Sequence, residues 1–352
     1  MKTGTNESVR LAGLDLARFF AFAGMVIVNF RIVMGAENDQ GTLALLTGVL
    51  EGRAAATFVV LAGLGLGLAN IKSDHRTTVS VTLRRAIFLL VLGLLNALVF
   101  EADILHYYAF YFLFGVALLR LQSHALVTLI VLLNVAFVLL VIMLDYEHSW
   151  NWSDYSYADF WTPVGFVRNL FFNGFHPVIP WLSFLLFGFL LSRTSLSKVS
   201  LQNRLIISGL LVMIAAELFS LFIADQFHSL DPELIIFAAT KPMPPMPLYV
   251  LAGGAAAALM IGLCLRFAEW IDRVGMLKII ASAGRQTLTL YIAHILIGMG
   301  TLEALGMLGG QSIGTAVTAA LLFCVLAISY AFAWSKFFKR GPLEAVMRKL
   351  SR

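Results

Sequence analysis

Long apolar segments recur from one end of the chain to the other, separated by short polar connections. A helix needs about 20 predominantly apolar residues to cross the hydrocarbon core of a bilayer. The pattern therefore predicts an all-α, polytopic membrane protein with about ten transmembrane helices. We expect them near residues 14–34, 43–71, 84–101, 103–120, 125–145, 176–193, 203–224, 247–267, 279–300 and 315–337.

The second of these segments is longer than a crossing requires, and Glu51, Gly52 and Arg53 interrupt it. We expect either one long span or a short interfacial helix followed by the crossing. The number of crossings is the same in both cases.

The positions of Lys and Arg predict which side each connection lies on. If the N-terminus is cytoplasmic, most basic residues fall on the inner side, and only Arg31, Arg53, Arg168 and Lys241 fall on the outer side. Cytoplasmic loops carry an excess of Lys and Arg. An even number of crossings preserves this asymmetry, so both termini are expected in the cytoplasm.

The composition leaves no room for a soluble module. Of the 352 residues, 60% are hydrophobic and only 13% are charged, about half the charge of a typical soluble domain. We expect a single transmembrane domain over 1–352. The basic residues are dispersed between apolar segments, which argues against nucleic acid as a partner. Cys264 and Cys324 lie within apolar runs, and no motif for a metal occurs.

Ionisable and amide side chains within a span are costly and often mark a functional site. The first helix contains Asp15, Arg18 and Asn29. Asp15 and Arg18 are three residues apart and can pair on one face. Eleven residues separate Arg18 from Asn29, so both lie on one stripe of the helix, roughly 16 Å apart. The alternative is that Asp15 and Arg18 anchor the helix end while Asn29 joins two helices by a hydrogen bond.

Two further polar clusters are expected at the outer surface. One contains Glu101, Asp103 and His106, in which a carboxylate three residues before a histidine can orient it as a base. The alternative is a helix cap formed by Asp103. The other cluster contains His176, before Pro177 and Trp181, where His176 is either a catalytic base or a cap at the start of the sixth helix.

The outer loop from Tyr146 to Phe175 is rich in Trp, Tyr and carboxylates, which indicates either an interfacial aromatic belt or a platform for a sugar ring. The ninth helix is unusually polar, and Arg285, Gln286 and Thr289 are expected on neighbouring positions of one face. That helix also contains Tyr291 and His294 and should face the protein interior.

Taken together, these segments resemble heparan-α-glucosaminide N-acetyltransferase and its bacterial YeiB-like relatives, in the transmembrane acyltransferase superfamily. The resemblance is carried by segments 14–18, 28–30, 51–53, 103–108, 174–181, 244–249 and 284–291. It implies acyl transfer from cytoplasmic acetyl-CoA or another acyl-CoA to a small-molecule or glycan acceptor on the outer side, in a bacterial inner membrane. In that branch a catalytic histidine follows the first helix, whereas Met34–Gln40 contains none.

We therefore expect Asn29 to stabilise the oxyanion and His176 or His106, with Asp103, to act as the base. Asp15, Arg18, Arg84, Arg85 and Arg285 are assigned to acyl-CoA binding, and Glu101, Trp181, Gln286, Tyr291 and His294 to acceptor binding. Membrane lipids are expected partners, and a homodimer remains open. The alternative function is transport of a small polar or lipid-linked substrate without acyl transfer. A transporter often carries an inverted repeat, and we find no convincing symmetry between 1–175 and 176–352.

Overall fold

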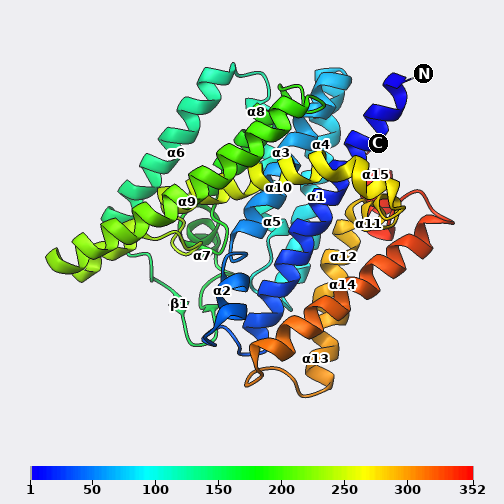
Figure 1. Ribbon diagram of the computed structural model, residues 1–352. Coiled ribbons are helices and arrows are strands. Elements are labelled where there is room, and N and C mark those ends of the chain that lie inside the picture. The colour runs from blue at the N-terminus through cyan, green and yellow to red at the C-terminus, as the bar shows by residue number, and fades with distance from the viewer. Residues whose placement is uncertain (1, 352) are drawn as a thin grey trace. The chain divides into compact units, whose positions relative to one another are not determined.

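The computed structural model describes residues 2–351, with the side chains of 2–11, 228–229 and 232–233 left undescribed. The chain is almost entirely helical (Figure 1). In chain order the elements are α1 (Lys2–Val33), α2 (Thr42–Gly48), α3 (Arg53–Lys72), α4 (His75–Ala97), α5 (Leu105–Leu118), α6 (Ser123–Met143), β1 (Trp150–Asn151), β2 (Ser156–Tyr157), α7 (Pro163–Arg168), η1 (Asn169–Asn173), α8 (Val178–Ser192), α9 (Val199–Leu230), η2 (Pro232–Ala238), α10 (Pro247–Arg273), α11 (Leu277–Gly284), α12 (Thr287–Ala293), η3 (His294–Met299), α13 (Gly300–Ala304), α14 (Ile313–Ser335) and α15 (Pro342–Leu350).

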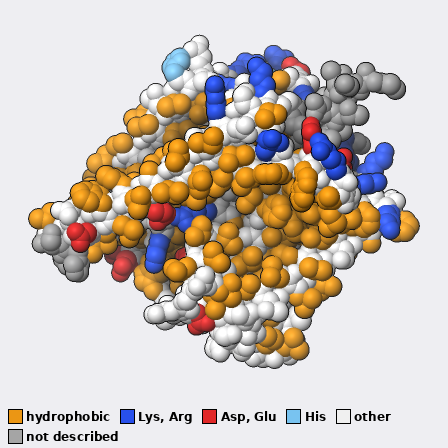
Figure 2. All heavy atoms as spheres, in the orientation of Figure 1, with side chains coloured by type: hydrophobic (Ala, Val, Ile, Leu, Met, Phe, Trp, Pro, Cys, Tyr) orange, Lys and Arg blue, Asp and Glu red, His pale blue; other side chains and the backbone are white. Residues whose placement is uncertain are grey.

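The prediction of an all-α polytopic membrane protein is confirmed. Within the described residues, eight helices are long and apolar enough to cross a membrane, and the bent pair Pro163–Asn173 and Val178–Ser192 makes a ninth if it is one span. The segment predicted at 103–120 is the shorter apolar helix Leu105–Leu118. Large apolar side chains on α6 and α9 are exposed, and such side chains cover much of the face in Figure 2. Exposure of this kind suits a lipid surrounding.

Several helices begin or end at other residues than the sequence predicts. The helix predicted at 84–101 begins at His75, where the Asp74 side chain accepts hydrogen bonds from two backbone N–H groups of the first turn. The helix predicted at 279–300 is divided into α11 and a second helical segment, Thr287–Ala304. The segment predicted at 43–71 is likewise divided, into α2 and α3.

The connections that the sequence predicts on the outer side are more structured than the sequence indicates. The loop after α6 contains the β1–β2 hairpin, which pairs Trp150 with Tyr157, and then the short helices α7 and η1. The proline-rich run before α10 is not helical, as expected from its missing backbone donors. It forms a tight turn with a bridge between Pro242 and Pro245.

The chain divides into two compact units. Unit 1 contains Met1–Phe58, Ser195–Gly209 and Ala256–Val346, and unit 2 contains Val59–Thr194, Leu210–Ala255 and Met347–Arg352. The single transmembrane domain stays a prediction. In unit 1, α1 packs against α11 and α14. Gly284 lies so close to α1 that an added Cβ would be 1.8 Å from the Asp15 carbonyl oxygen.

In unit 2, α4 packs on α5, and α8 packs on both α5 and α6. The glycines of α3 allow the close approach of α8, because a Cβ on Gly63 would be 2.1 Å from the Leu185 carbonyl oxygen. Gly188 of α8 lies equally close to the backbone of α3. These glycines act in helix packing, as small residues usually do between membrane helices.

Candidate functional site

A cluster of charged residues lies at the end of α1 that is predicted to be cytoplasmic. Arg18 Nη1 donates to Asp15 Oδ1 at 2.5 Å, which confirms the predicted pair. Arg285, at the end of α11, reaches within 3.8 Å of the other Asp15 oxygen. The side chains of Arg18 and Arg285 are 31% and 42% exposed, whereas that of Asp15 is 12% exposed. Two partly exposed guanidinium groups on one carboxylate leave a net positive charge, which suits a phosphate.

Asn29, further along the same helix, pairs with a histidine that is distant in sequence. The side-chain amide of Asn29 lies 3.1 Å from His294 Nε2, at the start of η3. His294 Nδ1 contacts the Tyr291 carbonyl oxygen. A carbonyl can only accept, so Nδ1 carries the proton and Nε2 carries the lone pair. Asn29 Nδ2 therefore donates to Nε2, and its second N–H makes no hydrogen bond with a described residue.

The polar stripe predicted on α1 thus faces α11, α12 and η3. Asp15 contacts Gly284 and Arg285. Further along, the ring of Phe22 meets His294 edge-on with centroids 6.0 Å apart, and Asn29 bonds the same histidine, which is fully buried. The sequence singled out each partner as polar, but 265 positions separate Asn29 from His294. No local pattern links residues so far apart.

In unit 2, a buried network orients His106. Its Nδ1–H donates to Asp103 Oδ2 at 3.0 Å, and its backbone N–H donates to the same oxygen at 3.1 Å. Asn96 of α4 donates to Asp103 Oδ1 at 2.8 Å. Asp103 and His106 are both fully buried. With the proton on Nδ1, the lone pair is on Nε2, which has no hydrogen-bond partner in the part of the chain that the structure describes.

Aromatic rings enclose this histidine. His106 lies 4.0 Å from the ring of Tyr107 and 5.5 Å from that of Phe160, centroid to centroid. The sequence offered a helix cap by Asp103 as the alternative to an oriented base. The structure shows both the cap and the oriented base, because Asp103 accepts from the backbone N–H and from the imidazole of His106. A carboxylate bound to Nδ1 is the arrangement that keeps an imidazole in the basic tautomer.

The second candidate base, His176, precedes α8. The ring of His176 lies 4.6 Å from that of Trp181 and 5.7 Å from that of Tyr107. Its backbone carbonyl accepts from Tyr111 at 2.6 Å. His176 Nδ1 and Trp181 Nε1 are buried and make no hydrogen bond with any described residue. His106, Tyr107 and His176 therefore form one aromatic cluster, but only His106 has a carboxylate to orient it.

Glu101 stabilises the β1–β2 hairpin, since it accepts from the Tyr157 backbone N–H at 3.0 Å. The same hairpin is held by Arg168, which donates to both Asp159 oxygens at 2.6 and 2.7 Å. Trp150 and Trp152 stack 4.9 Å apart, and Trp152 is 38% exposed. The interfacial belt and the sugar platform both stay predictions for these rings.

The hydrogen bonds that Arg168 donates to Asp159 hold the pKa of this carboxyl below its ordinary value of 3.8. A carboxylate with a lowered pKa stabilises the folded state above its unfolded pKa, and that contribution is lost as the pH falls through the folded pKa. We expect the hairpin to stay ordered until the pH drops below the usual Asp range. Tryptophan fluorescence during acid titration measures this, and Asp159→Asn should abolish the acid transition. A transition that persists in the variant contradicts the assignment.

The prediction that Arg285, Gln286 and Thr289 lie on one helix face is wrong. Arg285 turns toward Asp15, whereas Gln286 is buried and donates to the Ala331 carbonyl of α14 at 2.8 Å. Thr289 donates to Glu344 of α15 at 2.6 Å. The reason is the break between α11 and α12, because helical spacing does not extend across it. Glu344 also accepts from the backbone of Leu288 and Thr289, where an anion is favourable at a helix N-terminus.

The remaining predicted residues are divided between the units. Arg84 and Arg85 lie on α4 in unit 2, whereas Arg18 and Arg285 belong to unit 1. Tyr291, in unit 1, is buried. Among the described side chains, no group of three or more His, Cys, Asp or Glu residues is placed to hold a metal ion.

Comparison with known families gives two matches. The model described as heparan-alpha-glucosaminide N-acetyltransferase, catalytic, matches residues 10–218, which is more than half of the 352 residues. A second model, described as a protein of unknown function (DUF418), matches residues 189–352. No curated protein and no solved structure gave a significant match.

Proposed function

Because the chain belongs to the heparan-α-glucosaminide N-acetyltransferase catalytic family, we propose that it is a membrane acyltransferase that uses a cytoplasmic acyl-CoA, such as acetyl-CoA. The acceptor is a sugar hydroxyl or amine on the outer side. The multi-pass membrane architecture supports a reaction that joins substrates from opposite sides of a bilayer.

The observation that carries this proposal is the buried network of Asn96, Asp103 and His106. A fully buried histidine with its Nδ1–H on a carboxylate and its Nε2 without a described partner is a prepared general base. A purely structural histidine is expected to use both ring nitrogens, because an unsatisfied buried polar atom is costly. His106 is therefore our choice over His176 for the base.

In the proposed reaction, His106 Nε2 takes the proton from the acceptor O–H or N–H. The acceptor atom then bonds to the thioester carbonyl carbon. The carbonyl oxygen becomes an oxyanion, which a preorganised N–H donor typically stabilises by a few kcal/mol. When the C–S bond breaks, the thiolate of CoA leaves and receives the proton held by His106.

Unit 1 contains the groups that we propose for binding the acyl donor. The guanidinium groups of Arg18 and Arg285 bind phosphates of CoA, and Asp15 holds both in place. His294 fixes the amide of Asn29, since its Nε2 accepts one of the two amide protons. The other N–H is thereby directed away from His294 and left for the substrate.

Arg18→Gln should weaken acetyl-CoA binding by roughly 10- to 100-fold, because a charge-assisted hydrogen bond contributes about 1.5–3 kcal/mol. Isothermal titration of the full-length protein with acetyl-CoA measures the change. Arg273→Gln is the matched control, since Arg273 also lies on the predicted cytoplasmic side and its side chain is 77% exposed.

Equal binding by the parent and Arg18→Gln would show that the phosphates bind elsewhere. Absence of acetyl-CoA binding by the parent, with longer acyl-CoA esters also inactive, would overturn the proposed function itself. A weakening by Arg273→Gln as large as that by Arg18→Gln would indicate a general charge effect instead of a defined site.

A further inference from the structure

The helix α12 begins at a break in the chain and receives no cap from the residue before it. Gln286 makes no side-chain hydrogen bond to the first turn of α12. Its side-chain amide donates instead to the Ser282 and Ala331 carbonyls, at 3.2 and 2.8 Å. The start of a helix leaves backbone N–H groups without a partner inside the helix, and a residue just before it usually accepts from one of them. The first turn of α12 therefore needs an acceptor from elsewhere in the chain.

Glu344 of α15 is that acceptor. Its Oε1 accepts from the backbone N–H groups of Leu288 and Thr289, at 2.8 and 3.1 Å. Its Oε2 accepts from the Thr289 hydroxyl at 2.6 Å, and the oxygen of that hydroxyl accepts from the Leu343 N–H at 3.1 Å. Gly341 leaves room for this contact, because an added Cβ would be 2.2 Å from Glu344 Oε2. One carboxylate thus binds three donors of a helix start, where negative charge is favourable.

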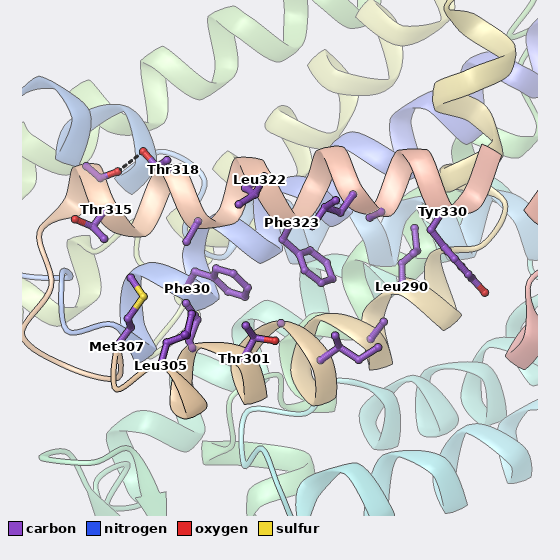
Figure 3. Close-up of a pocket in the computed structure, with 18 of the residues that line it drawn as sticks. Phe30, Leu290, Thr301, Leu305, Met307, Thr315, Thr318, Leu322, Phe323 and Tyr330 are labelled. Atoms are coloured by element: carbon purple, nitrogen blue, oxygen red, sulfur yellow. Dashed lines mark hydrogen bonds between the residues drawn. The ribbon is translucent and has the colours of Figure 1, made fainter. Parts of the chain in front are cut away.

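The side of α12 that faces α14 gives the helix little support. An apolar cavity of about 1050 Å³ lies between α14 and the segment α12–η3–α13 (Figure 3). Leu290 of α12 and Tyr330 of α14 line it near the same end. Side chains that border such a space lack packing partners on that side. In contrast, α11 packs against both α1 and α14. The position of α12 therefore depends strongly on the contacts at its two ends.

The far end of α12 leads to the histidine that orients Asn29. His294 follows α12 directly, seven residues after Thr287, and seven residues of helix rise roughly 10 Å. His294 Nε2 lies 3.1 Å from the Asn29 amide. Two turns of helix move together, so a shift at the start of α12 displaces His294. Asn29 would then lose the acceptor that directs its second N–H away from His294.

We propose that Glu344 is a positioning residue for Asn29, because it fixes the start of α12 and thereby holds His294 against the Asn29 amide. This inference rests on the proposed function, in which that amide contacts the substrate. The phosphate contacts are independent of this linkage. Arg18 and Arg285 both lie near Asp15, and Arg285 directly follows α11, before the start of α12.

The first test is the rate of acetyl transfer from acetyl-CoA to a glucosaminide by the full-length protein in proteoliposomes. Glu344→Ala should lower kcat by about 10- to 100-fold, because a displaced hydrogen-bond donor loses much of its effect on the reacting group. KM for acetyl-CoA should stay within about twofold of the parent value, since the phosphate contacts do not change. Glu303→Ala is the matched control, because Glu303 is an exposed residue of α13 in the same helical segment.

Two further variants separate positioning from general stability. Glu344→Gln keeps an oxygen for the Leu288 and Thr289 N–H groups and should retain most of the rate. In the Asn29→Ala background, Glu344→Ala should cause no further loss of kcat, because residues that act through one another are not additive. An equal loss in both backgrounds would overturn the proposal, as would a Glu344→Gln variant as slow as Glu344→Ala.

Backbone hydrogen exchange reports the same linkage without requiring activity. In Glu344→Ala, exchange should rise over residues 287–294 and stay at the parent level over 277–284. A rise limited to Leu288 and Thr289 would contradict the proposal, because it would show only local fraying. If exchange rises through His294 but the parent transfers no acetyl group, the linkage is retained and the acyltransferase function is rejected. The two failures are therefore distinguishable.

Discussion

His106→Gln is expected to lower the rate of acyl transfer by about 10²- to 10⁴-fold, the usual contribution of a general base. Glutamine keeps a polar side chain of similar size but cannot accept a proton at neutral pH. The measurement is transfer of a labelled acetyl group from acetyl-CoA to a glucosaminide acceptor in proteoliposomes. Acetyl-CoA binding should stay close to that of the parent, because His106 does not belong to the donor contacts.

Two further variants make this test specific. Asp103→Asn should also lower the rate, since an amide no longer holds the imidazole in the basic tautomer that the carboxylate selects. His124→Gln is the control, because His124 is exposed at the start of α6. Full activity of His106→Gln would contradict its role and leave His176, whose Nδ1 has no described partner, as the base to test next.

Gly284→Ala is expected to destabilise the protein by about 1–3 kcal/mol or more, because it overpacks a close contact. The added Cβ would be 1.8 Å from the Asp15 carbonyl oxygen and 2.5 Å from its carbon. Both atoms belong to the backbone, so no side-chain rotation relieves the clash. Since α11 must then move from α1, Arg285 should leave Asp15 and acetyl-CoA binding should weaken as well.

Thermal unfolding in detergent, followed by fluorescence, measures the first effect, and titration with acetyl-CoA measures the second. Gly300→Ala is the control, since a Cβ at Gly300 meets nothing within 4 Å. That variant should unfold near the parent temperature. If Gly284→Ala is as stable as the parent, the tight contact between α1 and α11 is not required.

The individual polar side chains were recognisable before the structure, whereas their partners were not. Asp15–Arg18 and Asp103–His106 were predicted correctly, because each pair is separated by three residues and a helical turn brings such residues together. Asn96 joins the second pair from α4, seven residues before Asp103 and across the break between two helices. The helical spacing rule gives no information across such a break.

The prediction failed where it assumed a continuous helix. Arg285 and Gln286 were expected on neighbouring positions of one face, but α11 ends at Gly284 and α12 begins at Thr287. Gln286 therefore turns to Ala331, and Glu344 satisfies the exposed backbone donors of α12. Hydropathy did not reveal this break within residues 279–300, because hydropathy measures burial in lipid and is insensitive to an interruption of the helix.

The sequence by itself determined the membrane class and the helical content, and it identified the polar residues within the spans that we propose for the chemistry. Those properties follow from transfer free energies and helical periodicity, which act within about twenty residues. Only the tertiary structure decided that Asn29 meets His294, that His106 keeps a nitrogen without a described partner, and that an apolar cavity adjoins α14. Such contacts depend on how distant helices pack, and no local pattern encodes the packing of segments hundreds of residues apart.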